Sequence, residues 1–201
     1  ARQILMERFA ENADLLAGLR QFLADHALLA SRLMEGKEQE GAKFRDYFAH
    51  TEALSKVPSH RALAMFRGRN EGMLALNLVM DAAEKPTDTH PCEAMVAAHW
   101  RIEDRQRPAD QWLRETVRWT WRVKLLTHLQ TDLLGQLRER AEREAIQVFA
   151  HNLKDLLLAA PAGPRATIGL DPGLRTGVKV AVVDANGKVL DHGAIYPHEP
   201  R

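Results

Sequence analysis

The feature that most limits how this chain can fold is one apolar stripe between residues 113 and 153, a segment without a proline, whose members recur mostly every four residues. Its members are Leu113, Val117, Trp121, Leu125, Leu129, Leu133, Leu137, Ala141, Ala145, Val148 and Leu153. This spacing keeps side chains on one face of a helix. Because Pro108 and Asp110 mark a helix start, we predict a helix from Asp110 nearly to Ala159, a scaffold strut that crosses Gly135.

The stripe ends where Pro161, Gly163 and Pro164 follow one another closely, and the residues after them are richer in glycine and β-branched side chains. Proline and glycine are the strongest local signals for the end of an element. We therefore predict a domain boundary here. Residues 1–160 form a helical scaffold, and residues 165–201 begin a β-rich domain.

The sequence before the stripe predicts a mainly helical structure. Apolar residues at helical spacing predict a helix from Leu5 to Leu33, which Gly36 ends. A second, short helix is expected over 42–49. Ser59 is placed to cap a helix over 60–67, with Gly68 as its left-handed stop.

The spacing of the apolar residues changes after Gly72. Apolar and smaller residues alternate over 73–79, which predicts a strand. Residues 85–89 read as a loop. Pro91, at a first helical position, opens a helix that runs to about Glu103.

Three strands are predicted after the boundary, over 166–171, 178–184 and 188–196. Asn186 and Gly187 tolerate the positive φ angles of a two-residue hairpin turn, so the last two strands should be antiparallel neighbours. Val178, Val180 and Val182 share one face of the middle strand. A sheet of only three strands is marginally stable in water. We therefore expect that the complete domain is larger and that the chain stops within it.

Charge and cysteine content narrow the function classes. The 28 Lys and Arg residues against 27 Asp and Glu residues give a net charge of +1, so nucleic-acid binding requires a local patch. Cys92 has no partner for an internal disulfide, and the chain shows no targeting signal. Apolar runs are far shorter than the roughly 20 residues that span a bilayer. We expect a cytoplasmic protein with no membrane contact.

Three sequence blocks resemble the Tex family of transcription accessory proteins. The first is KFRDYF from Lys43 to Phe48, and the second is VPSHRALA from Val57 with RGRNEG from Arg67. The third is IGLDPGLRTGVKV from Ile168 to Val180, and it continues through Val183 and Asp184 to His198. These blocks extend over most of the chain.

The resemblance implies a mainly α fold, in which a helical scaffold domain precedes the first β-strands of an RNase H-like (YqgF-type) α/β domain. It also implies a longer parent protein with helix-hairpin-helix elements and an oligonucleotide-binding barrel. The implied partner is single-stranded RNA or DNA, together with the transcription machinery. We expect this piece to be a non-enzymatic scaffold for nucleic-acid-binding modules. The alternatives are a metal-dependent nuclease or Holliday-junction resolvase, and a pure protein-interaction scaffold.

Asp171 is the one candidate for catalytic chemistry. It ends a predicted strand and precedes Pro172 and Gly173, which also makes it an ordinary turn signal. The resemblance makes it the counterpart of the first metal-binding aspartate of RNase H-like nucleases. Two-cation catalysis needs several carboxylates, so we regard Asp171 as an incomplete site. Asp184 is expected to be a turn residue.

Two clusters of basic residues could contact phosphates. His60, Arg61, Arg67 and Arg69 surround one short helix. Asp46, Glu52 and Glu71 lie close to them in sequence, so we favour ion pairing within the scaffold. Arg114, Arg118 and Arg122 recur every four residues on the long helix, near Trp112, Trp119 and Trp121. Arginine and aromatic side chains together suit single strands, although Glu115 shares this surface and packing is the commoner role for such tryptophans.

Three other combinations of residues give weaker evidence for a functional site. Gly173, Thr176 and Gly177 resemble one phosphate loop of actin-like ATPases, which also need a second loop far downstream. His90, Cys92 and His99 lack the paired spacing of a zinc site. Ser59 and His60 have no aspartate partner for a hydrolase triad. We therefore predict no cofactor and no bound metal.

Overall fold

A computed structural model describes residues 1–81, 90–173 and 177–197 of this chain. The chain divides into two compact units, Ala1–Ala150 and His151–Arg201, and each is described by itself. Over these described residues it is mainly helical, as the sequence predicted, with one three-stranded antiparallel sheet in each unit. Within the described residues, no helix is both long and apolar enough to cross a membrane.

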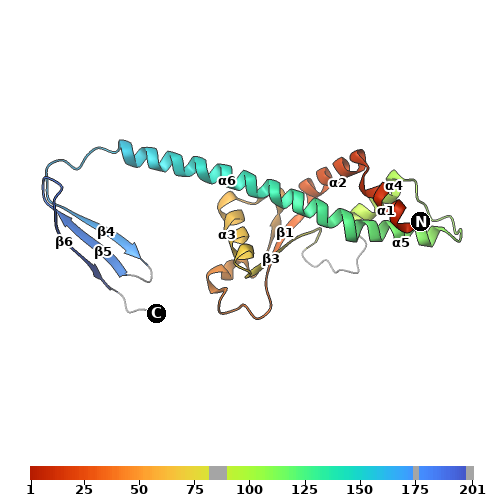
Figure 1. Ribbon diagram of the computed structural model, residues 1–201, viewed down its shortest axis with the longest axis horizontal. Helices are drawn as coiled ribbons and strands as arrows, with labels where there is room; N and C mark the ends of the chain where they lie inside the picture. The colour runs from red at the N-terminus through yellow and green to blue at the C-terminus, as the bar shows by residue number, and fades with distance from the viewer. Residues whose placement is uncertain (82–89, 174–176, 198–201) are drawn as a thin grey trace. The chain divides into compact units, whose positions relative to one another are not determined.

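One helical run forms the backbone of the first unit and then continues beyond it (Figure 1). It consists of α5 (Asp110–Trp119), the π-helical segment η3 (Thr120–Leu125) and α6 (Leu126–Leu158). The predicted long helix is therefore confirmed. Its apolar stripe is buried from Val117 to Ala141, while Val148 and Leu153 at the far end are exposed.

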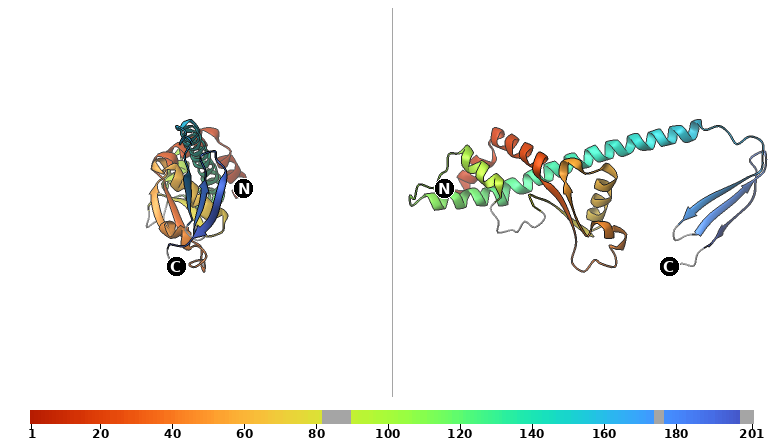
Figure 2. Two further views of the ribbon diagram at one scale, coloured as in Figure 1. Left: turned by 90° about the vertical axis from the view of Figure 1, so that its left-hand side faces the viewer. Right: turned by 180° about the vertical axis from the view of Figure 1, so that it is seen from behind.

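The first sheet has the order β2-β1-β3, with β1 (Leu28–Leu33) between β2 (Ala49–Ala53) and β3 (Leu74–Val79). Both pairings are antiparallel. The strand predicted over 73–79 is confirmed. The helix α3 (Ser59–Asn70) packs against β3, and the views of Figure 2 show it beside this sheet.

The helix predicted from Leu5 to Leu33 is wrong as one element. It divides into α1 (Arg2–Ala10) and α2 (Ala13–His26), because the Asn12 side chain accepts a hydrogen bond from the Leu15 N–H and caps a new helix. The last part becomes β1. As the middle strand of the sheet, β1 satisfies its backbone groups on both sides, which overrides its helical apolar spacing.

Two shorter predictions also need correction. The helix expected over 42–49 is the 3-10 helix η1 (Ala42–Tyr47), and a second one, η2 (Leu54–Lys56), follows β2. The helix from Pro91 is α4 (Pro91–His99), which ends early because Arg101 has a positive φ of 51°. The loop predicted over 85–89 lies outside the described residues.

The ends of α3 differ from the prediction. The Ser59 hydroxyl donates to the Glu144 carboxylate on α6 and does not cap its own helix. Gly68 lies within the helix, and Gly72, with a φ of 74°, is the left-handed residue after it. Gly68 is needed for close packing, because a Cβ on it would lie 2.5 Å from Leu74 Cδ1.

The core of the first unit lies between the long helical run, α2, α3 and the sheet. It contains Leu19 and Leu23 from α2, Met65 from α3, Leu29 from β1, and Trp121, Leu125 and Leu129 from the long run, all nearly free of solvent exposure. The long run is therefore held along one side by the rest of the unit. Its opposite side stays available for surface residues.

The second unit contains β4 (Thr167–Gly173), β5 (Gly177–Val183) and β6 (Val189–Ile195) in that order. Both pairings are antiparallel, which confirms the predicted hairpin between the last two strands. Its loop is longer than the predicted two residues. The backbone pairs Asp184 with Lys188, and only Gly187 has a positive φ there.

Candidate nucleic-acid interface

Arg114, Arg118 and Arg122 form one row on α5 and η3, here called the arginine row. Each binds a carboxylate from the segment that precedes α5. Arg114 Nη2 lies 2.9 Å from Asp104 Oδ2. Arg118 Nε and Arg122 Nε lie 3.5 Å and 3.4 Å from the two oxygens of Glu93. The row is therefore an ordered surface, in which Arg114 and Arg118 remain about half exposed.

Glu93 is the anchor of this row and was not anticipated from the sequence. It lies in the first turn of α4, where a carboxylate interacts favourably with the helix dipole. Only 6% of it is exposed. A buried carboxylate needs a cationic partner, and Arg118 and Arg122 supply two. The sequence offers no signal for this pairing, because Glu93 is separated from Arg118 by a helix end, a loop and most of α5.

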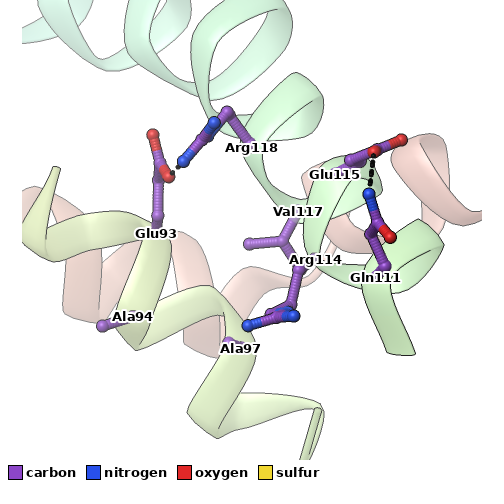
Figure 3. A pocket seen from close by; sticks show the side chains of 8 residues that line it. All are labelled: Glu93, Ala94, Ala97, Gln111, Arg114, Glu115, Val117 and Arg118. Atoms are coloured by element: carbon purple, nitrogen blue, oxygen red, sulfur yellow. Dashed lines mark hydrogen bonds and ion pairs between the residues drawn. The ribbon is translucent and has the colours of Figure 1, made fainter. Parts of the chain in front are cut away.

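A groove lies between α4 and α5 beside the arginine row (Figure 3). Its volume is about 440 Å³. Figure 3 shows Arg118 turned toward Glu93 and Arg114 lying beside Ala97. The lining residues are Glu93, Ala94, Ala97, Gln111, Arg114, Glu115, Val117 and Arg118. Arg114 and Arg118 therefore border a groove that is lined in part by small apolar side chains.

The three tryptophans near the row have different environments. Trp121 is 1% exposed and packs against the His90 ring, with ring centroids 4.4 Å apart. Trp112 is half-buried, with the Arg2 guanidinium 5.6 Å from its ring centroid. Trp119 is 54% exposed. Trp121 therefore has a packing role in the core, whereas the exposed ring of Trp119 is accessible to a partner.

The basic cluster around α3 is largely occupied by carboxylates of the same unit. Arg61 Nη1 lies 2.6 Å from Glu52 Oε2, and Arg67 Nε lies 2.9 Å from Glu71 Oε1. Hydrogen bonds from Lys43 and Arg67 hold the pKa of Glu71 below its usual value. Both pairings agree with the favoured interpretation of this cluster. Among the described residues, no ion pair involves the third expected carboxylate, Asp46.

His60 and Arg69 complete the α3 cluster, and both are exposed. The Arg69 guanidinium lies 5.0 Å from the ring centroid of Phe66. Arg67 and Arg69 also lie in the last turn of α3, where positive charge complements the helix dipole. Local stabilisation therefore explains most of this cluster.

Asp171 lies on β4 directly opposite Lys179 on β5. Its Oδ2 is 3.6 Å from Lys179 Nζ, and 77% of its side chain is exposed. Asp184 is the expected turn residue, because its Oδ1 accepts from the backbone N–H groups of Asn186 and Lys188. In the part of the chain that the structure describes, no three His, Cys, Asp or Glu side chains gather closely enough to hold a metal ion.

The remaining motifs have structural explanations or lie partly outside the described residues. His90 caps α4, since its Nδ1 accepts from the Cys92 N–H at 3.1 Å. Gly177 has a φ of 73° beside β6. Thr176, the hydroxyl of the suggested phosphate loop, lies outside the described residues.

Comparisons with known proteins match both units to family models. Residues 1–149 match the family described as Tex central region-like, and residues 165–201 match the Tex protein YqgF-like domain. Protein YhgF of Escherichia coli is 61% identical over 98% of the chain. Transcriptional accessory protein Tex of Neisseria gonorrhoeae is 50% identical over 99%. The chain spans 26% of the length of each of these two proteins.

A more distant relative is the human S1 RNA-binding domain-containing protein 1. It is 24% identical over 98% of the chain, which spans 20% of its length. Similarity of this extent over both units relates the whole chain, and not one motif, to these proteins.

Proposed function

This chain belongs to the Tex family, and on that premise we propose that it is the scaffold of a nucleic-acid-binding transcription accessory factor. Two relatives support the proposal by name, one as a transcriptional accessory protein and one as a protein with an RNA-binding domain. The scaffold role is supported by the long helical run, along which the core of the first unit is assembled. The transcription machinery is the partner class that these names suggest.

The observation that carries the proposal is the arginine row. Four residues along a helix correspond to about 6 Å, so the row presents guanidinium groups at short, regular intervals. A guanidinium has five N–H donors in a fixed fork, so one that binds a carboxylate can also bind phosphate. Trp119 lies on the same helix and is exposed. Backbone contacts combined with a stacking ring suit a single strand.

The local charge supports the same assignment. Residues 101–124 contain seven Lys and Arg residues against four Asp and Glu residues, whereas the whole chain carries only +1. Positive charge is thus concentrated around α5. Because carboxylates bind the row, we propose that it contributes auxiliary contacts and that other modules of the parent protein supply most of the affinity.

Titration of residues 1–201 with fluorescent single-stranded RNA at two salt concentrations tests this proposal. We expect a dissociation constant of about 10⁻⁴ to 10⁻⁶ M at physiological salt, as in non-specific binding, and tighter binding at low salt. Sub-micromolar binding at physiological salt would contradict the auxiliary role. Absence of binding at low salt would contradict the contact itself.

A metal-dependent nuclease is the second candidate, and the observation that favours it is the exposure of Asp171. This carboxylate could be approached from solvent. A cation pair needs further carboxylate ligands, and the charged side chain that pairs with Asp171, Lys179, has the wrong sign for that role. We therefore propose that this chain has no catalytic function of its own.

A further inference from the structure

The groove between α4 and α5 has a floor of small aliphatic side chains. Ala94 and Ala97 come from α4 and Val117 from α5. Val117 is buried, whereas Ala94 and Ala97 leave room above them. The volume of about 440 Å³ lies within the range of natural ligand pockets, roughly 300 to 1,000 Å³. The hollow is therefore large enough to accept side chains from a partner.

The rim of the groove carries two arginines, Arg114 and Arg118, and two glutamates, Glu93 and Glu115. Arg114 and Arg118 border it with side chains that are 55% and 51% exposed. Their own partners are Asp104, 44% exposed, and Glu93. Because ion pairs near the surface are weak, a carboxylate from outside can share or replace Asp104 at little cost. Glu115 is paired with Arg2, and Glu93 with both Arg118 and Arg122. Among the described residues of these ion pairs, four guanidinium groups therefore meet three carboxylates, and this excess of one positive charge favours an acidic partner.

The side chains at the bottom of the groove distinguish between two kinds of acidic partner, a single-stranded nucleic acid and a protein helix. Single-stranded bases bind by stacking on aromatic rings, and none of the described residues that line this groove is aromatic. Methyl groups between two helices instead fit leucine-like side chains, as in complexes where an amphipathic helix lies in a groove. We infer that this groove binds an acidic amphipathic helix of a partner protein, with aliphatic side chains over Ala97 and Val117 and carboxylates on Arg114 and Arg118.

A helix bound in the groove would also occupy part of the arginine row. The proposed nucleic-acid contact uses Arg114 and Arg118 as well, so the helix and a single strand cannot both occupy them. Binding of the partner protein therefore competes with binding of nucleic acid. The competition rests on the proposed function, whereas the groove as a protein-binding site does not.

The test uses residues 1–201 and a fluorescein-labelled helical peptide whose leucines lie three and four residues apart among Glu and Asp. A matched peptide has serine in place of leucine. Ala97→Leu fills the groove without changing charge, and Ala98→Leu makes the same change at an exposed neighbour outside the lining. Ala94→Leu is a second filling variant at an exposed position, which covers the case in which Ala97→Leu disturbs folding.

We expect the leucine peptide to bind more tightly than the serine peptide. A filled groove should weaken its binding about tenfold or more, as expected for loss of a central anchor. Ala98→Leu should leave binding unchanged. In a parallel titration with single-stranded RNA, the filled-groove variants should bind like the wild type, and the peptide should displace the RNA.

Equal binding of the two peptides, or equal binding by filled and open grooves, would overturn the inference. Loss of RNA binding in the filled-groove variants would also overturn it, because the groove would then hold a nucleobase. If RNA fails to bind while the leucine peptide binds as expected, the proposed nucleic-acid contact fails and the protein-binding groove stands.

Discussion

At the scale of single residues, Asp110 shows how a buried charge organises the surface around it. It begins α5 and is 1% exposed. Its carboxylate accepts from the backbone N–H groups of Arg105 and Arg107, both at 2.9 Å, and from Arg107 Nη2 at 2.8 Å. The Arg107 side chain first, and then these backbone groups, lower the pKa of Asp110 to about 2. Asp110 thus ties the loop before α5 to the helix that carries the arginine row.

This arrangement predicts an acid-sensitive contribution to stability. The pKa of Asp110 is lower in the folded chain than the value of about 3.9 for an unfolded aspartate. Its stabilising effect is therefore fully present above that value and is lost as the pH falls toward 2. Asp110→Asn should lower the melting temperature at pH 7, and the difference from wild type should shrink below pH 4.

Thermal unfolding followed by circular dichroism between pH 7 and pH 2.5 measures this difference. Asp104→Asn is the control. The exposed ion pair of Asp104 with Arg114 contributes little to stability, and asparagine keeps an oxygen for the hydrogen bond that Asp104 Oδ1 accepts from the Gln106 N–H. A wild-type advantage that stays constant across this pH range would contradict the role given to Asp110.

Two helical glycines make a matched pair for a second test. A Cβ on Gly68 would lie 2.5 Å and 2.8 Å from Leu74 Cδ1 and Cγ, and Leu74 is buried. A Cβ on Gly135 would meet nothing within 4 Å. Gly68→Ala should therefore destabilise by about 1 to 3 kcal/mol through overpacking. Gly135→Ala should stabilise by about 0.5 to 1 kcal/mol.

Chemical denaturation of the two variants measures both free energies of unfolding. Similar effects of the two substitutions would mean that α3 and β3 are not packed as closely as the structure has them.

At the scale of elements, the sequence predicted the pieces whose signal is local. The stripe from Val117 to Ala141 needs only helical spacing, and the hairpin near Gly187 needs only turn chemistry. β1 was missed because its strand character comes from pairing with β2 and β3, which lie 16 or more residues away in the chain. Glu93 was missed for the same reason. Its role depends on the packing of α4 against α5.

The sheet β4-β5-β6 gives a prediction about local stability. Ile168 and Leu170 on β4 are 64% and 63% exposed, and Ile195 on β6 is 54% exposed. A sheet with exposed apolar side chains and free edges is marginal. We expect faster amide hydrogen exchange over Ile168 to Ile195 than over β1 and β3, or protection that depends on protein concentration. Strong protection in a demonstrated monomer would contradict this expectation.

At the scale of the whole molecule, the role of Asp171 has to be tested in the parent protein, because this chain spans only about a quarter of its Tex relatives. Wild type and Asp171→Asn should be assayed with Mg²⁺ or Mn²⁺ on branched DNA, single-stranded DNA and RNA. We expect no cleavage by either and equal RNA binding by both. Cleavage by the wild type alone would replace the accessory-factor proposal with the nuclease alternative.

The proposed function depends on the arginine row, and the salt dependence of RNA binding shows whether this row contacts phosphates. Binding constants of residues 1–201 for single-stranded RNA should be measured from low to moderate salt in three proteins: wild type, Arg114→Gln with Arg118→Gln, and Arg61→Gln with Arg67→Gln. Each lost phosphate contact reduces the log–log slope by roughly 0.7. We expect the first pair to reduce the slope by about 1.4 and the α3 pair to leave it unchanged. A slope that changes only with the α3 pair, or with neither, would contradict a phosphate contact by Arg114 and Arg118.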